Sequence, residues 1–165
     1  MVGKKLIVYY SLEGNTDYAA GMIAELTESD KLRLVTRKAY TDKGFIKFLW
    51  NGRSAIMGEK PELEPYDADL SQYDMIVFGF PVWASNFTPP LRTFIEDNRE
   101  KLAGKRFAAF ACEAGNGGDI ALGKLLECLG AEKFEESAIL IEPLKRKSEE
   151  SEQDIAEFCM KLKEL

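Results

Sequence analysis

Histidine is absent from this chain of 165 residues. Its absence excludes Ser-His-Asp and Cys-His nucleophile activation and histidine-ligated metal sites, because each of these needs an imidazole. Cysteine is scarce too, with three residues and no CxxC spacing, so neither a disulfide framework nor a thiolate metal site is indicated. We therefore expect any chemistry of this protein to belong to a cofactor.

The chain also has fewer basic than acidic residues, and it has no long apolar run. The 22 Lys and Arg residues are outnumbered by 28 Asp and Glu residues, which gives a net charge of −6. This balance argues against a nucleic acid partner and favours protein partners with basic docking surfaces. The one basic cluster, Lys145-Arg146-Lys147, is predicted to be a solvated loop. No apolar run approaches the roughly 20 residues of a membrane span, and no export signal is visible, so we expect no membrane partner and a cytoplasmic location.

The length fits one domain, residues 1–165, with a single core. Short apolar runs alternate with helical patterns, which is typical of an α/β protein whose parallel strands are joined by helical crossovers. Strands are predicted at 4–10, 31–37, 75–79, 105–111 and 132–141, and helices at 17–26, 45–57, 90–100, 119–129 and 148–163. Trp50 lies on the second predicted helix, where core packing is its expected role.

The most informative stretch is a phosphate loop between the first strand and the first helix. Hydroxyls at Ser11 and Thr16, the amide at Asn15 and loop N–H groups can converge on one phosphate, while Gly14 permits a tight turn. There is no Lys after a GxxxxG and no GxGxxG, so the loop is neither a nucleoside triphosphate loop nor a dinucleotide fingerprint. It is predicted to hold a lone monoester phosphate.

Two further loops follow the third and fourth predicted strands. Ligands of an open doubly wound sheet bind outside the carboxyl ends of its strands, so these loops are expected to meet the phosphate loop. The candidate binding residues are Ser11, Leu12, Glu13, Gly14, Asn15 and Thr16 in the first loop, Pro81, Val82, Trp83, Ala84, Ser85 and Asn86 in the second, and Cys112, Glu113, Gly115, Asn116, Gly117 and Gly118 in the third. Cys112 is interpreted as a small hydrophobic residue, because nothing nearby in the sequence would lower its pKa.

These motifs resemble those of the flavodoxin family, in particular its small bacterial flavodoxin-like members. The family signature, Ser/Thr-x-Thr-Gly-x-Thr, is matched at five of six positions by residues 11–16, and Glu13 stands where the family usually has a hydroxyl. The resemblance implies a doubly wound five-stranded parallel sheet in the order 2-1-3-4-5, with helices on both faces in a three-layer α/β/α arrangement. It also implies FMN as cofactor, with Trp83 against the isoalloxazine ring and the Gly-rich loop after Ala111 near the pyrimidine oxygens. The structural alternative for Trp83 is packing beneath its loop.

Two departures from the family pattern bear on function. Ala84 follows Trp83 where classical carriers often have Gly, and Ala resists the left-handed backbone conformation. The loop after the fourth strand lacks the aromatic that covers the other flavin face in classical members, so one face is expected to be open.

Three functions remain in competition. The first is an FMN-dependent electron carrier between protein partners. The second is an FMN-dependent NAD(P)H or quinone oxidoreductase that uses the open flavin face. The third is a binding module that kept the fold and lost the flavin, which the carboxylate of Glu13 beside the phosphate would favour.

Overall fold

The computed structural model describes residues 3–40, 51 and 53–165. Most of the predicted helix 45–57, Trp50 included, lies outside the described residues, although residues 51 and 53–56 are helical. The strands are β1 (Lys5–Tyr9), β2 (Asp30–Arg33), β3 (Met75–Pro81), β4 (Arg106–Glu113) and β5 (Ser137–Ile141). They form one parallel sheet in the order β2-β1-β3-β4-β5, which confirms the predicted α/β fold and strand order.

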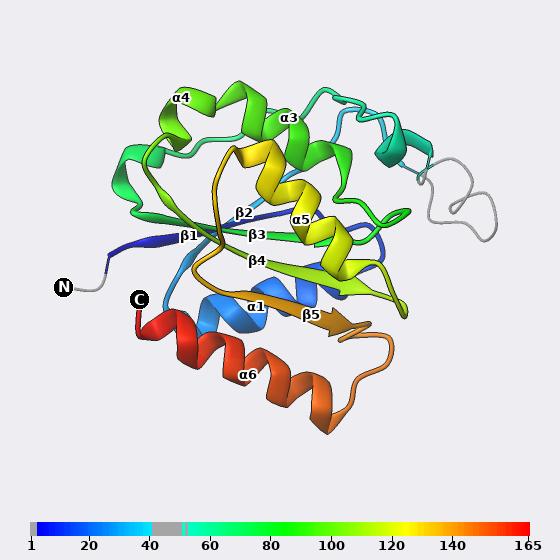
Figure 1. The fold of residues 1–165 in the computed structure, drawn as a ribbon, viewed down its shortest axis with the longest axis vertical. Helices are drawn as coiled ribbons and strands as arrows, with labels where there is room; N and C mark the ends of the chain where they lie inside the picture. Colours follow the sequence, from blue (N-terminus) through cyan, green and yellow to red (C-terminus); the bar gives the residue numbers. More distant parts are fainter. Residues whose placement is uncertain (1–2, 41–50, 52) are drawn as a thin grey trace.

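Helices cover both faces of this sheet, as Figure 1 shows. On one face lie α1 (Asn15–Thr27) and α6 (Glu149–Lys163), and on the other lie α3 (Pro89–Asp97), α4 (Arg99–Leu102) and α5 (Gly118–Leu129). A short 3-10 helix, η1 (Leu70–Gln72), precedes β3. None of the helices in the described part of the chain is long and apolar enough to cross a bilayer.

The core is divided by the sheet into two apolar clusters, because successive side chains of a strand point to opposite faces. In the central strand β3, Ile76 and Phe78 belong to one cluster and Met75 and Val77 to the other, and all four are fully buried. Each such side chain contributes roughly 2 kcal/mol to folding. A strand that is apolar on both faces is therefore stable only in the middle of the three layers.

Some element boundaries differ from the predicted ones for identifiable reasons. β2 ends at Arg33, earlier than predicted, and its exposed, charged residues fit its position at the sheet edge. The predicted helix 90–100 is interrupted at Asn98, whose side-chain nitrogen donates to the carbonyl of Phe94 at 2.8 Å and to Tyr66 Oη at 2.8 Å. This side chain competes with the helical backbone for hydrogen bonds, so α3 ends there and α4 begins anew.

Candidate functional site

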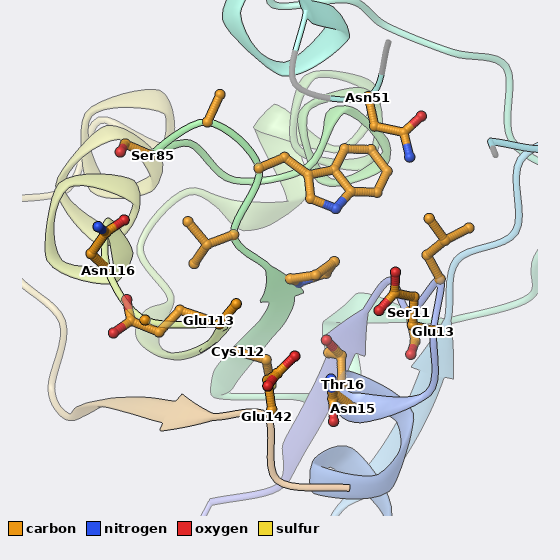
Figure 2. A pocket seen from close by; sticks show the side chains of 17 residues that line it. Ser11, Glu13, Asn15, Thr16, Asn51, Ser85, Cys112, Glu113, Asn116 and Glu142 are labelled. Carbon is orange, nitrogen blue, oxygen red and sulfur yellow. The ribbon is translucent and has the colours of Figure 1, made fainter. Parts of the chain in front are cut away.

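A cavity of about 530 Å³ lies where β1, β3, β4 and β5 end at their carboxyl termini, the edge predicted for a ligand. Figure 2 shows the side chains around it. The residues that line the cavity are Ser11, Leu12, Glu13, Asn15, Thr16, Asn51, Pro81, Val82, Trp83, Ala84, Ser85, Cys112, Glu113, Ala114, Gly115, Asn116 and Glu142. The three predicted loops therefore meet in one place.

The first wall of the cavity is the loop between β1 and α1. Gly14 precedes α1 with a φ of 107°, a left-handed conformation that a residue with a Cβ adopts only with strain. The first N–H groups of α1 have no acceptor within the helix, and the first two residues of the helix, Asn15 and Thr16, line the cavity. Ser11 Oγ accepts the N–H of Asp17 at 3.1 Å. Loop and helix terminus are thus held as one unit with its positive end at the cavity.

Thr16 places a buried hydroxyl at the cavity that a ligand oxygen could satisfy. The residue is 1% exposed, and within the described residues its hydroxyl has no hydrogen-bond partner, the nearby Cys112 thiol being at most a weak one. A buried polar group without a partner costs about 1–3 kcal/mol. Because Thr16 lines the cavity on the first turn of α1, an oxygen atom of a ligand placed there would satisfy this hydroxyl.

A polar network behind the loop holds it to the sheet. Tyr9 Oη donates to Asp17 Oδ1 at 2.6 Å, and burial together with this bond raises the pKa of Tyr9. Arg33 reaches from β2 to pair with Asp17 at 3.5 Å and to donate to the carbonyl of Ser11 at 3.2 Å. The loop is therefore anchored from β1 and β2 independently of any ligand.

The second wall is a tight turn from Trp83 to Asn86. The N–H of each of these two residues donates to the other's carbonyl at 3.0 Å. The central residues, Ala84 and Ser85, have φ values of 50° and 56°. Positive φ at both central positions is characteristic of type I′ turns, which favour Asn-Gly. Ala84 adopts this conformation although it is unfavourable for a residue with a Cβ: the paired backbone of Trp83 and Asn86 imposes it, at the cost of strain.

Trp83 both lines the cavity and packs against aromatic neighbours beneath its loop. The residue is 9% exposed and lines the cavity, and its ring also packs edge-on against Tyr10 and Tyr40, with ring centroids 5.8 Å and 5.1 Å away. Burial raises the pKa of Tyr40 to about 12, so its ring remains neutral. The indole is held rigidly by these neighbours, which lowers the entropy cost of stacking against a flat ligand.

The third wall is the loop after β4. Glu113 Oε2 accepts the N–H of Gly118 at 2.7 Å, at the start of α5. Gly117 has a φ of 92°, and a Cβ there would lie 2.7 Å from Ser85 Oγ. Only glycine allows the second and third walls to approach this closely. Burial raises the pKa of Cys112 to about 12, in agreement with its interpretation as a small hydrophobic residue.

Four predicted residues do not themselves line the cavity. Gly14, Gly117 and Gly118 shape the loops from behind. Asn86 is buried, and its side chain is used within the protein: Nδ2 donates to the carbonyl of Ala55 at 2.8 Å, and Oδ1 accepts the N–H of Phe87 at 2.9 Å. Asn86 therefore supports the turn that holds Trp83.

Three residues of the cavity were not predicted: Asn51, Ala114 and Glu142. Ala114 belongs to the predicted third loop, and Asn51 carries no signal in the sequence. Glu142 directly follows β5 with a φ of 37°, and its N–H donates to the carbonyl of Glu113 at 3.0 Å. The rule that ligands sit at strand ends could have found Glu142, had it been applied to the fifth strand as well.

Residues 142–146, which we call the strap, connect the end of β5 to two of the cavity walls. Lys145 forms an ion pair with Glu13, and Arg146 pairs with Glu142 at 3.6 Å and donates to the carbonyl of Ala114 at 3.3 Å. The basic cluster is exposed, as predicted, but two of its residues contact the site. Two of the three carboxylates around the cavity thus have a basic partner.

Comparison with known proteins places this architecture in a family. The family model described as Flavodoxin matches residues 4–152. A flavoprotein from Lactobacillus acidophilus, solved in complex with FMN, is 25% identical, with a TM-score of 0.71 over 83% of this chain and 93% of that one. The flavodoxins of Megasphaera elsdenii and Bacillus cereus are 17% and 18% identical and show the same fold, with TM-scores of 0.60 and 0.56. These alignments cover 98% and 97% of this chain, and 99% and 97% of the two flavodoxins.

The match of the family model extends over nearly the entire chain, and it includes the loops that form all three walls of the cavity. The strand order β2-β1-β3-β4-β5 and the cavity at the carboxyl ends of the strands are consistent with this match. This chain belongs to the flavodoxin family.

Proposed function

We propose that this chain binds FMN in the cavity and passes electrons between protein partners. Membership of the family supports this function, and so does the related flavoprotein of Lactobacillus acidophilus, which was crystallised with FMN. The observation that carries the proposal is the buried hydroxyl of Thr16, which has no partner among the described residues and faces the cavity at the N-terminus of α1.

The donors around the cavity fit FMN from end to end. At one end, the Thr16 hydroxyl, the Ser11 hydroxyl and the first N–H groups of α1 would hold the phosphate. At the other end, the indole of Trp83 offers an apolar face for the ring. In the third wall, the small residues Ala114 and Gly115 would let backbone groups approach the polar edge of the ring.

FMN, when bound, supplies reversible one- and two-electron chemistry. The chain positions it and sets its electrostatic surroundings. Glu113 places a carboxylate at the cavity that, unlike Glu142, has no basic partner among the described residues, and negative charge disfavours reduction of a neighbouring group to an anion. The net charge of −6 would steer partners with basic surfaces toward the protein.

One observation favours a second candidate function, that of an FMN-dependent NAD(P)H or quinone oxidoreductase. Among the described residues that line the cavity, Trp83 is the one aromatic, and the loop 112–117 contributes small and polar side chains instead. A flavin stacked on Trp83 would then keep one face accessible to nicotinamide or a quinone.

An anaerobic reductive titration of the purified protein with added FMN tests these proposals. An electron carrier should show flavin absorbance and reduction in one-electron steps, marked by a transient long-wavelength band, without steady-state oxidation of NAD(P)H. Direct two-electron bleaching with NAD(P)H turnover on a quinone would favour the oxidoreductase. Absence of FMN binding would refute both, and would leave a flavin-free binding module.

A matched pair of variants tests the role of Thr16. Thr16 and Thr88 both bury a hydroxyl without a partner among the described residues, but only Thr16 lines the cavity. Thr16→Val and Thr88→Val should each raise the free energy of unfolding of the FMN-free protein by about 1 kcal/mol. Only Thr16→Val should weaken FMN binding, by about tenfold. Equal FMN affinities in the two variants would contradict the placement of the phosphate.

A further inference from the structure

The phosphate loop contains a carboxylate that a phosphate should repel, and the strap compensates for it. Glu13 is mostly buried at the cavity, with its side chain 19% exposed. Its carboxylate pairs with Lys145, which lies 132 positions later in the chain. Lys145 therefore counters the negative charge of Glu13 beside the place where an anion would bind in the loop.

The strap also orients Asn15, the first residue of α1. Asn15 Oδ1 accepts the backbone N–H groups of Leu144 and Lys145, each at 3.0 Å. Two donors on one atom identify it as the oxygen of the amide, because the nitrogen cannot accept. Asn15 lines the cavity, so the amide nitrogen, with its two N–H donors, remains on the cavity side.

We propose that the strap converts an acidic loop into a phosphate site, with Lys145 as counter-ion of Glu13 and the strap backbone turning the Asn15 amide nitrogen toward the phosphate. This inference rests on the proposed binding of FMN. Lys145 acts through Glu13 and is a positioning residue, not a phosphate ligand. The loop of this chain would consequently depend on a segment at the far end of the sequence for its affinity.

Lys147 provides a matched control for Lys145. Both are exposed lysines that follow β5: the side chain of Lys145 is 45% exposed and that of Lys147 is 55% exposed. Lys147, however, pairs with Glu152 of α6, at 3.3 Å. Lys145→Met should weaken FMN binding about tenfold, whereas Lys147→Met should change it less than about twofold. Riboflavin, which lacks the phosphate, should bind Lys145→Met and the unmodified protein with the same affinity.

Removal of the opposing charge should rescue the affinity. The double variant Glu13→Gln with Lys145→Met should bind FMN within about threefold of the unmodified protein, because the carboxylate and its counter-ion are then removed together. Asn15→Asp keeps the two acceptor bonds to the strap but loses the N–H donors, so it should weaken FMN binding at least about tenfold with little change in apoprotein stability.

Several outcomes would overturn the inference. Equal FMN affinities of Lys145→Met and Lys147→Met would do so, as would an equal loss of riboflavin affinity, or a double variant that is not rescued. A binding assay with inorganic phosphate distinguishes failure of this inference from failure of the proposed binding of FMN. If the protein binds no flavin, thermal stabilisation by phosphate that is lost in Lys145→Met but kept in Lys147→Met supports the strap mechanism, and stabilisation that is absent or equal in the two variants refutes it.

Discussion

Replacement of Ala84 by glycine tests the strain that the structure places beside Trp83. Ala84 is exposed and has a φ of 50°, so its methyl group contributes strain without core packing. The left-handed conformation costs a residue with a Cβ roughly 1–2 kcal/mol. Glycine removes that cost but loses about 0.5–1 kcal/mol more conformational entropy on folding. The difference between these two ranges is about 0–1.5 kcal/mol, so Ala84→Gly should raise the free energy of unfolding by about 0.75 kcal/mol.

In a domain of this size, such a gain corresponds to an increase in Tm of about 1–4 °C. Ala114→Gly is the matched control, because Ala114 is also exposed, lies on another loop of the same cavity and is not among the residues with positive φ. It should lower the stability by about 0.5–1 kcal/mol, from the entropy cost alone. Changes of opposite sign in the free energy of unfolding of the two variants, measured by thermal and urea unfolding, would establish the strain at Ala84. A decrease in Ala84→Gly as large as that in Ala114→Gly would refute it.

Three further predictions concern the walls of the site and its thiols. Gly117→Ala should destabilise the protein by about 2 kcal/mol in urea unfolding, because Gly117 has a φ of 92° and a Cβ there would contact Ser85. Gly123→Ala is the control: Gly123 lies in open space on α5, so this substitution should stabilise the protein by up to about 1 kcal/mol. Cys112 should resist alkylation in the native protein at neutral pH, since burial raises its pKa to about 12, and rapid labelling would contradict this. The pKa of the Cys112 thiol is about 12 in the folded protein, above its ordinary value of 9.0. The raised pKa contributes stability that is fully present below pH 9.0 and is lost as the pH rises toward about 12. The urea concentration at the unfolding midpoint should therefore decrease as the pH rises above 9.0. This decrease should be less steep in Cys112→Ala.

Much of the fold was predictable because local patterns and the general rules of parallel sheets act together. The unbroken apolar run of β3 indicates a central strand, and the charged alternation around Leu32 indicates an edge. Both were confirmed. The boundary at Asn98 was missed, because it depends on a hydrogen bond to Tyr66, which lies 32 positions away in the chain. Local helical pattern does not contain that information.

Three of the loops around the cavity could be predicted from the sequence alone, because parallel strands bring their carboxyl ends to one edge whatever the packing details. Residues 11–16, Trp83 and Glu113 were recognisable on that basis. How these loops are completed depends on contacts that exist only in the folded protein. The left-handed conformation of Ala84 follows from the paired backbone around it, and the charge of Glu13 is compensated by Lys145 from beyond β5. Both depend on contacts between segments that meet only when the sheet has formed, so no local pattern could reveal them.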